Sequence, residues 1–370
     1  VQQRVEILKA LYRKAELLIL DEPTAVLTPG EVEELFIILR KLAEDGLSII
    51  FISHKLEEVR TICEKVTVLR GGRVVDTVDA CDTSARELAK MMVGREVFLK
   101  FDKPRIEPGE VVLSVKNLSA KDNRDLPAVR GVSFDVRRHE ILGIAGVDGN
   151  GQTELAEVIA GLRESTGGTV SILGQNTTRK KPREIIAMNV AYIPPDRQHT
   201  GLLMDFSITE NLVGKAFWKP NFSRSGFLLK KKLDAFADRA IREFDVRTPG
   251  AGLKAKLLSG GNQQKVVLAR ELSGNPDLVI ASQPTRGLDI GATEYVHKQM
   301  LEARARGAAI LFISTELEEV LSLSDRIAVM YEGQIMGIVP AQDADIHEIG
   351  EMMAGVRRLG KPVVLGEKMD

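Results

Sequence analysis

The stretch EILGIAGVDGNGQTEL, residues 140–155, places a glycine-rich loop between an apolar run and a segment with helical spacing. The apolar run is short and continuous, as in a strand buried on both faces. The loop contains three glycines, Gly146, Gly149 and Gly151. Backbone N–H groups of such a loop can bind phosphate oxygens at a helix N-terminus. A plain glycine-rich turn between strand and helix is the alternative interpretation.

The residues that open the expected helix depart from the usual phosphate-loop pattern. In that pattern a lysine reaches the phosphates and the following serine or threonine binds Mg²⁺. Here Gln152 stands at the lysine position and Thr153 keeps the hydroxyl. The loop can therefore hold the metal-binding oxygen but lacks the charge.

Apolar runs alternate with helical patterns along the chain. The expected strands are EILGIAG (140–146), NVAYIP (189–194), DLVIAS (277–282), AILFIS (309–314) and RIAVMY (326–331). Helical spacing is found at 152–161, 263–273, 292–306 and 317–323. This alternation predicts an α/β fold around a mostly parallel sheet. Residues from about 205 to 272 contain few strand signals, and we expect them to form a helical insertion.

The chain also repeats itself at one offset. QQRVEILKALYR from Gln2 matches QQKVVLARELSG from Gln263, and 263 − 2 = 261. LLILDEPT, which ends at Thr24, matches LVIASQPT, which ends at Thr285, and 285 − 24 = 261. IIFISHKLEEV with ILFISTELEEV, VTVLRGG with IAVMYEG, and MMVG with MMAG follow in the same register. Five motifs in one register indicate two copies of one domain.

The second copy contains more than the first. From Val111 to the point that matches Gln2 lie about 150 residues that have no counterpart in the first copy. We therefore expect an N-terminally truncated chain. The expected organisation is the C-terminal part of a first domain (1–95), a linker (96–110), a complete second domain (111–355) and a tail (356–370).

LLSGGNQQK, Leu257–Lys265, lies downstream of the loop and changes its interpretation. Ser259 and the N–H groups of Gly260 and Gly261 would stand at a helix start, which suits a γ-phosphate. A polar helix cap with two flexible glycines is the alternative. The string resembles the signature motif of ATP-binding-cassette (ABC) ATPases. The phosphate loop, the signature, the acidic strand end and the switch position recur in that family's order over nearly the whole chain.

The resemblance implies a P-loop NTPase cassette, with a mostly parallel sheet and a helical subdomain, that uses ATP and Mg²⁺. It also implies a set of nucleotide-binding positions. These are Gly146, Gly149, Gly151, Gln152, Thr153, Ser259, Gly260, Gly261, Asn262 and Gln263.

The first copy carries the acidic strand end. LLILDEPT places Asp21 and Glu22 after a buried strand, where ligand sites form in α/β folds. An acidic pair there could instead cap the next helix. The resemblance makes Asp21, like Thr153, a Mg²⁺ partner and makes Glu22 the group that polarises the attacking water. His54, after IIFIS, is similar to the family's switch histidine, which contacts the γ-phosphate.

The second copy lacks all of these groups. Gln152 replaces the lysine, Ser282 the aspartate, Gln283 the glutamate and Thr315 the histidine. In cassette ATPases the nucleotide lies between two domains, with the loop of one facing the signature of the other. We therefore expect the second signature to complete the first domain's site, while the second domain's own site is degenerate. The truncated chain alone is expected to be inactive.

The composition also indicates which kinds of partner and environment the chain is suited to. The chain has 370 residues, 44% of them hydrophobic, and a net charge of −1, which gives no support to a nucleic-acid partner. Its two cysteines, Cys63 and Cys81, form no metal or disulfide pattern, which suits a reducing cytoplasm. No apolar run approaches the ~18 residues of a membrane span.

A degenerate second cassette after an intact first one resembles the ATPase subunits of bacterial ribose, galactose and nucleoside importers. SQPTRGLDIGATEYVH and YIPPDRQHTGLLMDFSITENL look closest to the nucleoside branch, and Gln283 stands where the monosaccharide branch usually keeps glutamate. The resemblance implies nucleoside uptake, transmembrane permease subunits as partners and a substrate-binding lipoprotein reached through the permease. It also implies a peripheral position on the cytoplasmic face of the membrane, with residues 199–212 as the expected permease contact.

Three other interpretations stay open on the sequence alone. The first is a monosaccharide importer ATPase. The second is a soluble twin-cassette ATPase that acts on ribosomes or DNA, although such proteins tend to have two intact sites and a long basic linker, unlike residues 96–110. The third is a nucleotide-binding module that does not hydrolyse.

Overall fold

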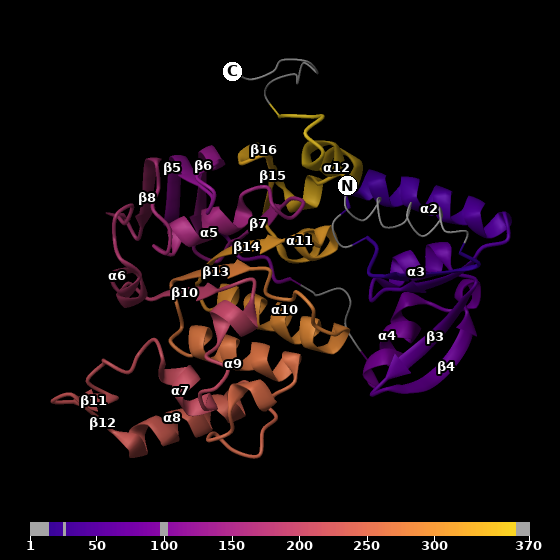
Figure 1. Ribbon diagram of the computed structural model, residues 1–370. Helices are drawn as coiled ribbons and strands as arrows, with labels where there is room; N and C mark the ends of the chain where they lie inside the picture. The colour runs from indigo at the N-terminus through magenta and orange to yellow at the C-terminus, as the bar shows by residue number, and fades with distance from the viewer. Residues whose placement is uncertain (1–14, 25–26, 97–102, 360–370) are drawn as a thin grey trace. The chain divides into compact units, whose positions relative to one another are not determined.

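The computed structural model of the protein describes residues 15–24, 27–96 and 103–359. These residues form two compact units (Figure 1). The first unit contains the described residues up to 96 together with 289–294, and the second unit contains the remainder.

The second unit is built on a six-stranded sheet in the order β10-β13-β14-β7-β15-β16. Its strands are β7 (Ile141–Ala145), β10 (Val190–Ile193), β13 (Leu278–Ser282), β14 (Ala309–Ser314), β15 (Arg326–Tyr331) and β16 (Gln334–Pro340). The strands from β10 to β15 pair in parallel, and only β16 is antiparallel to its neighbour. Every residue of β7, β13 and β14 is buried. The five apolar runs expected to be strands, and the mostly parallel sheet, are therefore confirmed.

A second, antiparallel sheet lies in the same unit. Its order is β6-β5-β8-β9, with β5 (Val111–Lys121), β6 (Pro127–Arg137), β8 (Gly167–Ile172) and β9 (Gln175–Asn176). Helix α5 (Gln152–Ile159) contacts β13 of the large sheet and both β5 and β6 of the small one. The other helices outside the insertion are α6 (Pro182–Ala187), α10 (Ile290–Ala305), α11 (Leu317–Leu323) and α12 (Ile346–Met353).

The helical insertion is confirmed, with one addition. Helices α7 (Ile208–Val213), α8 (Lys230–Glu243) and α9 (Gly260–Leu272) pack on one another. Helix α7 begins at a capping box, in which Ser207 and Glu210 each bond the other's backbone N–H. A short hairpin of β11 (Ser223–Arg224) and β12 (Phe227–Leu228) also lies here, and its two-residue strands are too short to leave a period-2 pattern.

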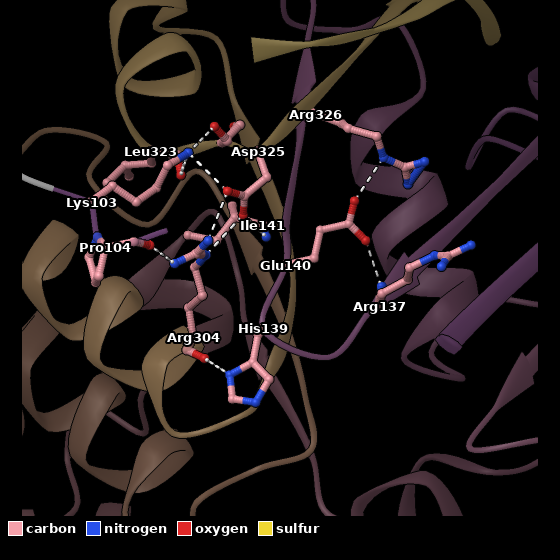
Figure 2. Close-up of polar contacts among 11 residues, drawn as sticks. Lys103, Pro104, Arg137, His139, Glu140, Ile141, Arg304, Leu323, Asp325 and Arg326 are labelled. Atoms are coloured by element: carbon pink, nitrogen blue, oxygen red, sulfur yellow. Dashed lines mark hydrogen bonds and ion pairs between the residues drawn. The ribbon is translucent and has the colours of Figure 1, made fainter. Parts of the chain in front are cut away.

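Buried ion pairs fix the start of β7, the strand that leads to the glycine-rich loop (Figure 2). The carboxylate of Asp325 accepts from the backbone N–H of Ile141 at 2.8 Å and from two guanidinium nitrogens of Arg304 at 2.9 and 3.0 Å. Glu140, just before the strand, accepts from Arg326 Nε at 2.7 Å. Arg304 and Glu140 are buried, and buried charges are tolerated only when they are paired. The strand is thus held at the end away from the loop.

The first unit repeats the last elements of the second in the same order. It contains β1 (Leu17–Asp21), α2 (Pro29–Glu44), β2 (Ser48–Ile52), α3 (Leu56–Ile62), β3 (Lys65–Arg70), β4 (Arg73–Asp79) and α4 (Ala85–Val93). Strands β1 and β2 pair in parallel like β13 and β14, and β3 and β4 form an antiparallel hairpin like β15 and β16. Helix α2 begins at a capping box of Thr28 and Glu31, with Pro29 in its first turn.

The two units differ in what covers the shared strands. In the second unit β7 lies between β14 and β15, whereas no strand of the first unit's described residues joins β2 to β3. Ile19 of β1 is 59% exposed, while its counterpart Ile280 is 0% exposed. Leu17, Ile50 and Ile52 are also exposed, although their counterparts 261 residues later are buried. Among the described residues of the first unit, this apolar sheet face is therefore exposed.

We expect matched alanine substitutions to have unequal effects in the purified 370-residue chain. Ile280→Ala should lower the free energy of unfolding of the second unit by about 2–5 kcal/mol, because it leaves a cavity in a packed core. Ile19→Ala should lower that of the first unit by less than about 1 kcal/mol, because the side chain is already exposed. Denaturant-dependent hydrogen exchange, read unit by unit, measures both values. Equal losses would show that the first unit's sheet face is covered in solution.

Candidate functional site

The glycine-rich loop joins β7 to α5, as the sequence predicts. Gly149 and Gly151 have positive φ angles of 88° and 96°, a conformation that side chains with a Cβ rarely adopt. A Cβ on Gly151 would also overlap the backbone carbonyl of Ala128. Gly151 is the residue that precedes α5, so the loop ends at a helix N-terminus. Thr153 lies in the first turn of that helix and is half-buried.

Gln152 is turned into its own loop. Its Nε2 donates to the carbonyl of Val147 at 3.0 Å, and its Oε1 accepts from the backbone N–H of Asn150 at 3.1 Å. The side chain is only 6% exposed. A backbone N–H that could bind a phosphate oxygen is therefore already bonded to the residue that replaces the lysine. Its amide braces the loop, a role that the sequence pattern did not indicate.

The strand ends beside this loop carry Ser282, Gln283 and Thr315, because β13, β14 and β7 are neighbouring parallel strands. Gln283 has a positive φ of 49°, and its N–H donates to the carbonyl of Ile313 at 2.8 Å. Its Oε1 accepts from the N–H and Oγ1 of Thr315 at 3.3 and 3.2 Å. The Ser282 hydroxyl is buried and has no hydrogen-bond partner among the described residues. The structure thus brings all the predicted degenerate positions to one edge of the sheet.

The first unit has the same backbone with different side chains. Glu22 follows β1 with a φ of 46°, and its N–H donates to the carbonyl of Ile52 at 2.9 Å. Its Oε1 accepts from the backbone N–H of His54 at 3.1 Å and lies 2.8 Å from Nδ1 of that ring. Its Oε2 is buried and has no partner among the described residues. Asp21, the last residue of β1, is exposed.

The pKa of Glu22 reflects two opposing effects. Partial burial raises the pKa of this carboxyl, but the hydrogen bonds and the charge of His54 lower it by more. The net pKa lies below the usual value for glutamate. Glu22 is therefore ionised at neutral pH, which a group that accepts a proton or a hydrogen bond from water requires.

The predicted signature residues stand at the start of α9, for which Ser259 is the N-cap. Asn262 donates to the Ser259 hydroxyl at 3.0 Å and accepts from the N–H of Arg247 at 2.8 Å. Gly260 lies beside the guanidinium of Arg197. Gln263 is buried, and its Nε2 donates to the carbonyls at 255 and 258. Ser259 to Asn262 thus lie at the N-terminus of α9, whereas the Gln263 side chain is directed into the protein.

Two residue pairs next to the strand ends were missed by the sequence analysis. Thr24 Oγ1 donates to Glu58 Oε2 at 2.6 Å in the first unit, and Thr285 Oγ1 donates to Glu319 Oε2 at 2.7 Å in the second. Both threonines are buried. The repeat contains the signal for these pairs, since 285 − 24 = 261 and 319 − 58 = 261.

Comparison with known proteins gives a family match and relatives that are similar over most of this chain. A family model described as ABC transporter matches residues 129–286. The nucleoside import ATP-binding protein NupA of Lactococcus lactis is 48% identical over 354 residues, which are 96% of this chain and 70% of NupA. The guanosine import ATP-binding protein NupO of Bacillus subtilis is 49% identical over 355 residues, which are 96% of this chain and 70% of NupO. The glucose import ATP-binding protein TsgD13 of Haloferax volcanii is 48% identical over 356 residues, 96% of this chain and 65% of TsgD13.

The chain therefore belongs to the ABC transporter family, as one of its ATP-binding proteins. The cassette fold expected from the signature motif is confirmed. The protein is an ABC transporter ATPase.

We expect Gln152→Glu to destabilise the second unit. The new carboxylate cannot donate to the Val147 carbonyl, which leaves two acceptors facing each other in a buried loop and should cost about 1–3 kcal/mol. Asp148→Asn, at an exposed position of the same loop, is the control and should change the free energy of unfolding by less than about 0.5 kcal/mol. Urea denaturation of the chain measures both. Equal stability of Gln152→Glu and the parent would mean that the amide does not brace the loop.

Proposed function

We propose that this ATPase couples ATP hydrolysis to the import of nucleosides. The relatives named for nucleoside and guanosine import, each similar over 96% of the chain, support this substrate class. The SQPTRGLD segment, which resembles the nucleoside branch, agrees with it. Sugar import is the second candidate, because the relative named for glucose import is 48% identical.

The geometry that supports hydrolysis most directly is the Glu22–His54 pair. We assign Glu22 as the general base, because its carboxylate is ionised, is bonded on one oxygen to His54 and has no hydrogen-bond partner on the other, Oε2, among the described residues. His54 orients that carboxylate and would contact the γ-phosphate. In the second unit Gln283 and Thr315 reproduce the contact, but an amide cannot accept the proton.

Asp21 and Thr153 are the proposed Mg²⁺ partners. Mg²⁺ is usually bound by one or two carboxylates together with substrate phosphates, so a single exposed carboxylate at the end of β1 fits such a site. The counterpart of Asp21 in the second unit is Ser282, which offers only a neutral, buried hydroxyl. The first unit therefore offers a carboxylate to the ion, whereas the second offers only the hydroxyls of Thr153 and Ser282.

We further propose that the two units are parts of tandem cassettes. The matching order of elements and the uncovered face of β1 and β2 support this arrangement, because the corresponding face of the second unit is covered by α5 and the small sheet. In the proposed pair, Ser259 to Asn262 complete the site of Glu22. Nucleotide contacts at the glycine-rich loop and at Gln263 remain predictions.

The partners would be transmembrane permease subunits, with a lipoprotein receptor beyond them and no nucleic acid. No helix in the described part of the chain is long and apolar enough to cross a bilayer. We place the protein on the cytoplasmic face of the membrane as a peripheral subunit. A groove of about 160 Å³ adjoins the segment 199–212 and is a candidate permease contact. It is lined by Ile185, Ile186, Pro194, Thr200, Lys215 and Arg270 among others.

In the complete transporter, Glu22→Gln should lower kcat for ATP by ~10²–10⁴, the usual effect of losing a general base. Gln283→Ala, at the matching position of the second unit, should leave kcat within about threefold, because no proton transfer passes through it. Phosphate release by the reconstituted complex measures both. Comparable losses would show that the two sites are not specialised.

Uptake of a labelled nucleoside by cells that carry the complete system should be reduced by excess unlabelled nucleosides. Glucose and ribose should not compete, because a site built to bond a base rejects molecules that lack it. Cells carrying the Glu22→Gln variant are the control for uptake by other routes. Competition by a sugar and not by nucleosides would replace the first candidate with the second.

A further inference from the structure

The geometry points to Glu58 as a positioning residue for ATP hydrolysis, acting through Thr24 on the catalytic Glu22. Thr24 follows Glu22 by two residues and is 1% exposed. Its hydroxyl donates to Glu58 Oε2 at 2.6 Å, a short contact of the kind that a charged acceptor forms. Glu58 lies on α3, which begins two residues after His54. The inference rests on the proposed role of Glu22.

The Thr24–Glu58 bond closes a small frame around the Glu22–His54 pair. One side of the frame is the bond from the Glu22 N–H to the carbonyl of Ile52. The opposite side ties the residues after Glu22 to the helix that follows His54. Because Glu22 has a left-handed backbone, its turn is strained and needs contacts on both sides. Without the hydroxyl, the turn could shift and carry the Glu22 carboxylate away from His54.

The second unit allows a positioning role of this bond to be distinguished from a role in folding. It has the same frame, with the Gln283 N–H bonded to the carbonyl of Ile313 and Thr285 bonded to Glu319. Glu319 is half-buried and also accepts from Ser314 Oγ at 2.9 Å. Since Gln283 cannot act as a base, the frame there can only support the fold. If the bond only supports the fold, removing it should have the same effect on kcat in either unit. If it positions Glu22, removing it should lower kcat only in the first unit.

A further contact stabilises the frame of the second unit. His297 Nε2 lies 3.2 Å from Glu319 Oε1, and the first unit has Phe36 at the matching position, since 297 − 261 = 36. Burial raises the pKa of Glu319, but the bonds from His297, Thr285 and Ser314 lower it by more. The charged acceptor is thus retained in a unit that has lost its chemistry, which fits a shared structural frame used for positioning in only one copy.

The test compares three variants in the complete transporter. Thr24→Val removes the hydroxyl at constant shape, Thr24→Ser keeps it, and Thr285→Val is the matched control in the second unit. We expect Thr24→Val to lower kcat by about 10- to 100-fold, the scale of a misplaced catalytic group. KM for ATP should stay within about twofold, because neither Thr24 nor Glu58 is proposed to contact the nucleotide. Thr24→Ser should restore kcat, and Thr285→Val should leave it unchanged.

A second pair covers the case in which Thr24→Val does not fold. Glu58→Gln keeps an oxygen that can accept from Thr24 and should retain turnover, whereas Glu58→Met should lose it. Equal effects of Thr24→Val and Thr285→Val on kcat, or full turnover in Glu58→Met, would overturn the proposal. Glu22→Gln is measured in parallel. Turnover retained by Glu22→Gln would refute the assignment of the general base and the positioning role with it, whereas an inactive Glu22→Gln beside an active Thr24→Val would refute only the latter.

Discussion

The parallel register of neighbouring strands is the constraint on which the candidate site depends. Asp21 pairs with Ile52 in one unit and Ser282 with Ile313 in the other, so the two strands of each pair end together. The next residue of the first strand turns into a left-handed conformation and donates its N–H across to the neighbour. Its side chain then meets the residue two positions beyond the neighbour's last paired residue. The register therefore brings Glu22 to His54 in the first unit and Gln283 to Thr315 in the second.

Strand β7 links this edge to the opposite end of the sheet. Its first residue is held by the carboxylate of Asp325, which is paired with the buried Arg304 (Figure 2). Its last residue leads into the loop braced by Gln152. Ion pairs thus hold the start of β7, and the neutral Gln152 amide braces the loop that follows its last residue. At the matching strand ends of the first unit, Glu22 and His54 supply ionisable groups.

Much of the fold was readable from the sequence, because strands buried on both faces leave continuous apolar runs and the repeat gives their register twice. The apolar spacing reveals α9 only from residue 263, since Gly260 to Asn262 carry no apolar signal, whereas the signature motif predicts its start at Ser259 correctly. Side-chain direction was not readable. Gln152 and Gln263 look like ligand-facing polar residues, yet both bond carbonyls of their own surroundings. The exposure of β1 and β2 could not be predicted either, because it depends on which segments pack against them rather than on their own residues.

The left-handed backbone at Gln283 has a consequence for how such a site changes over time. A non-glycine residue in this conformation costs on the order of 1–3 kcal/mol, and the chain retains it where the side chain has no proton to transfer. The φ angles of Glu22 and Gln283, 46° and 49°, are nearly equal. The two units therefore differ at this position in their side chains and share the conformation of the main chain. The main chain at Gln283 therefore already has the conformation that holds the glutamate in the first unit.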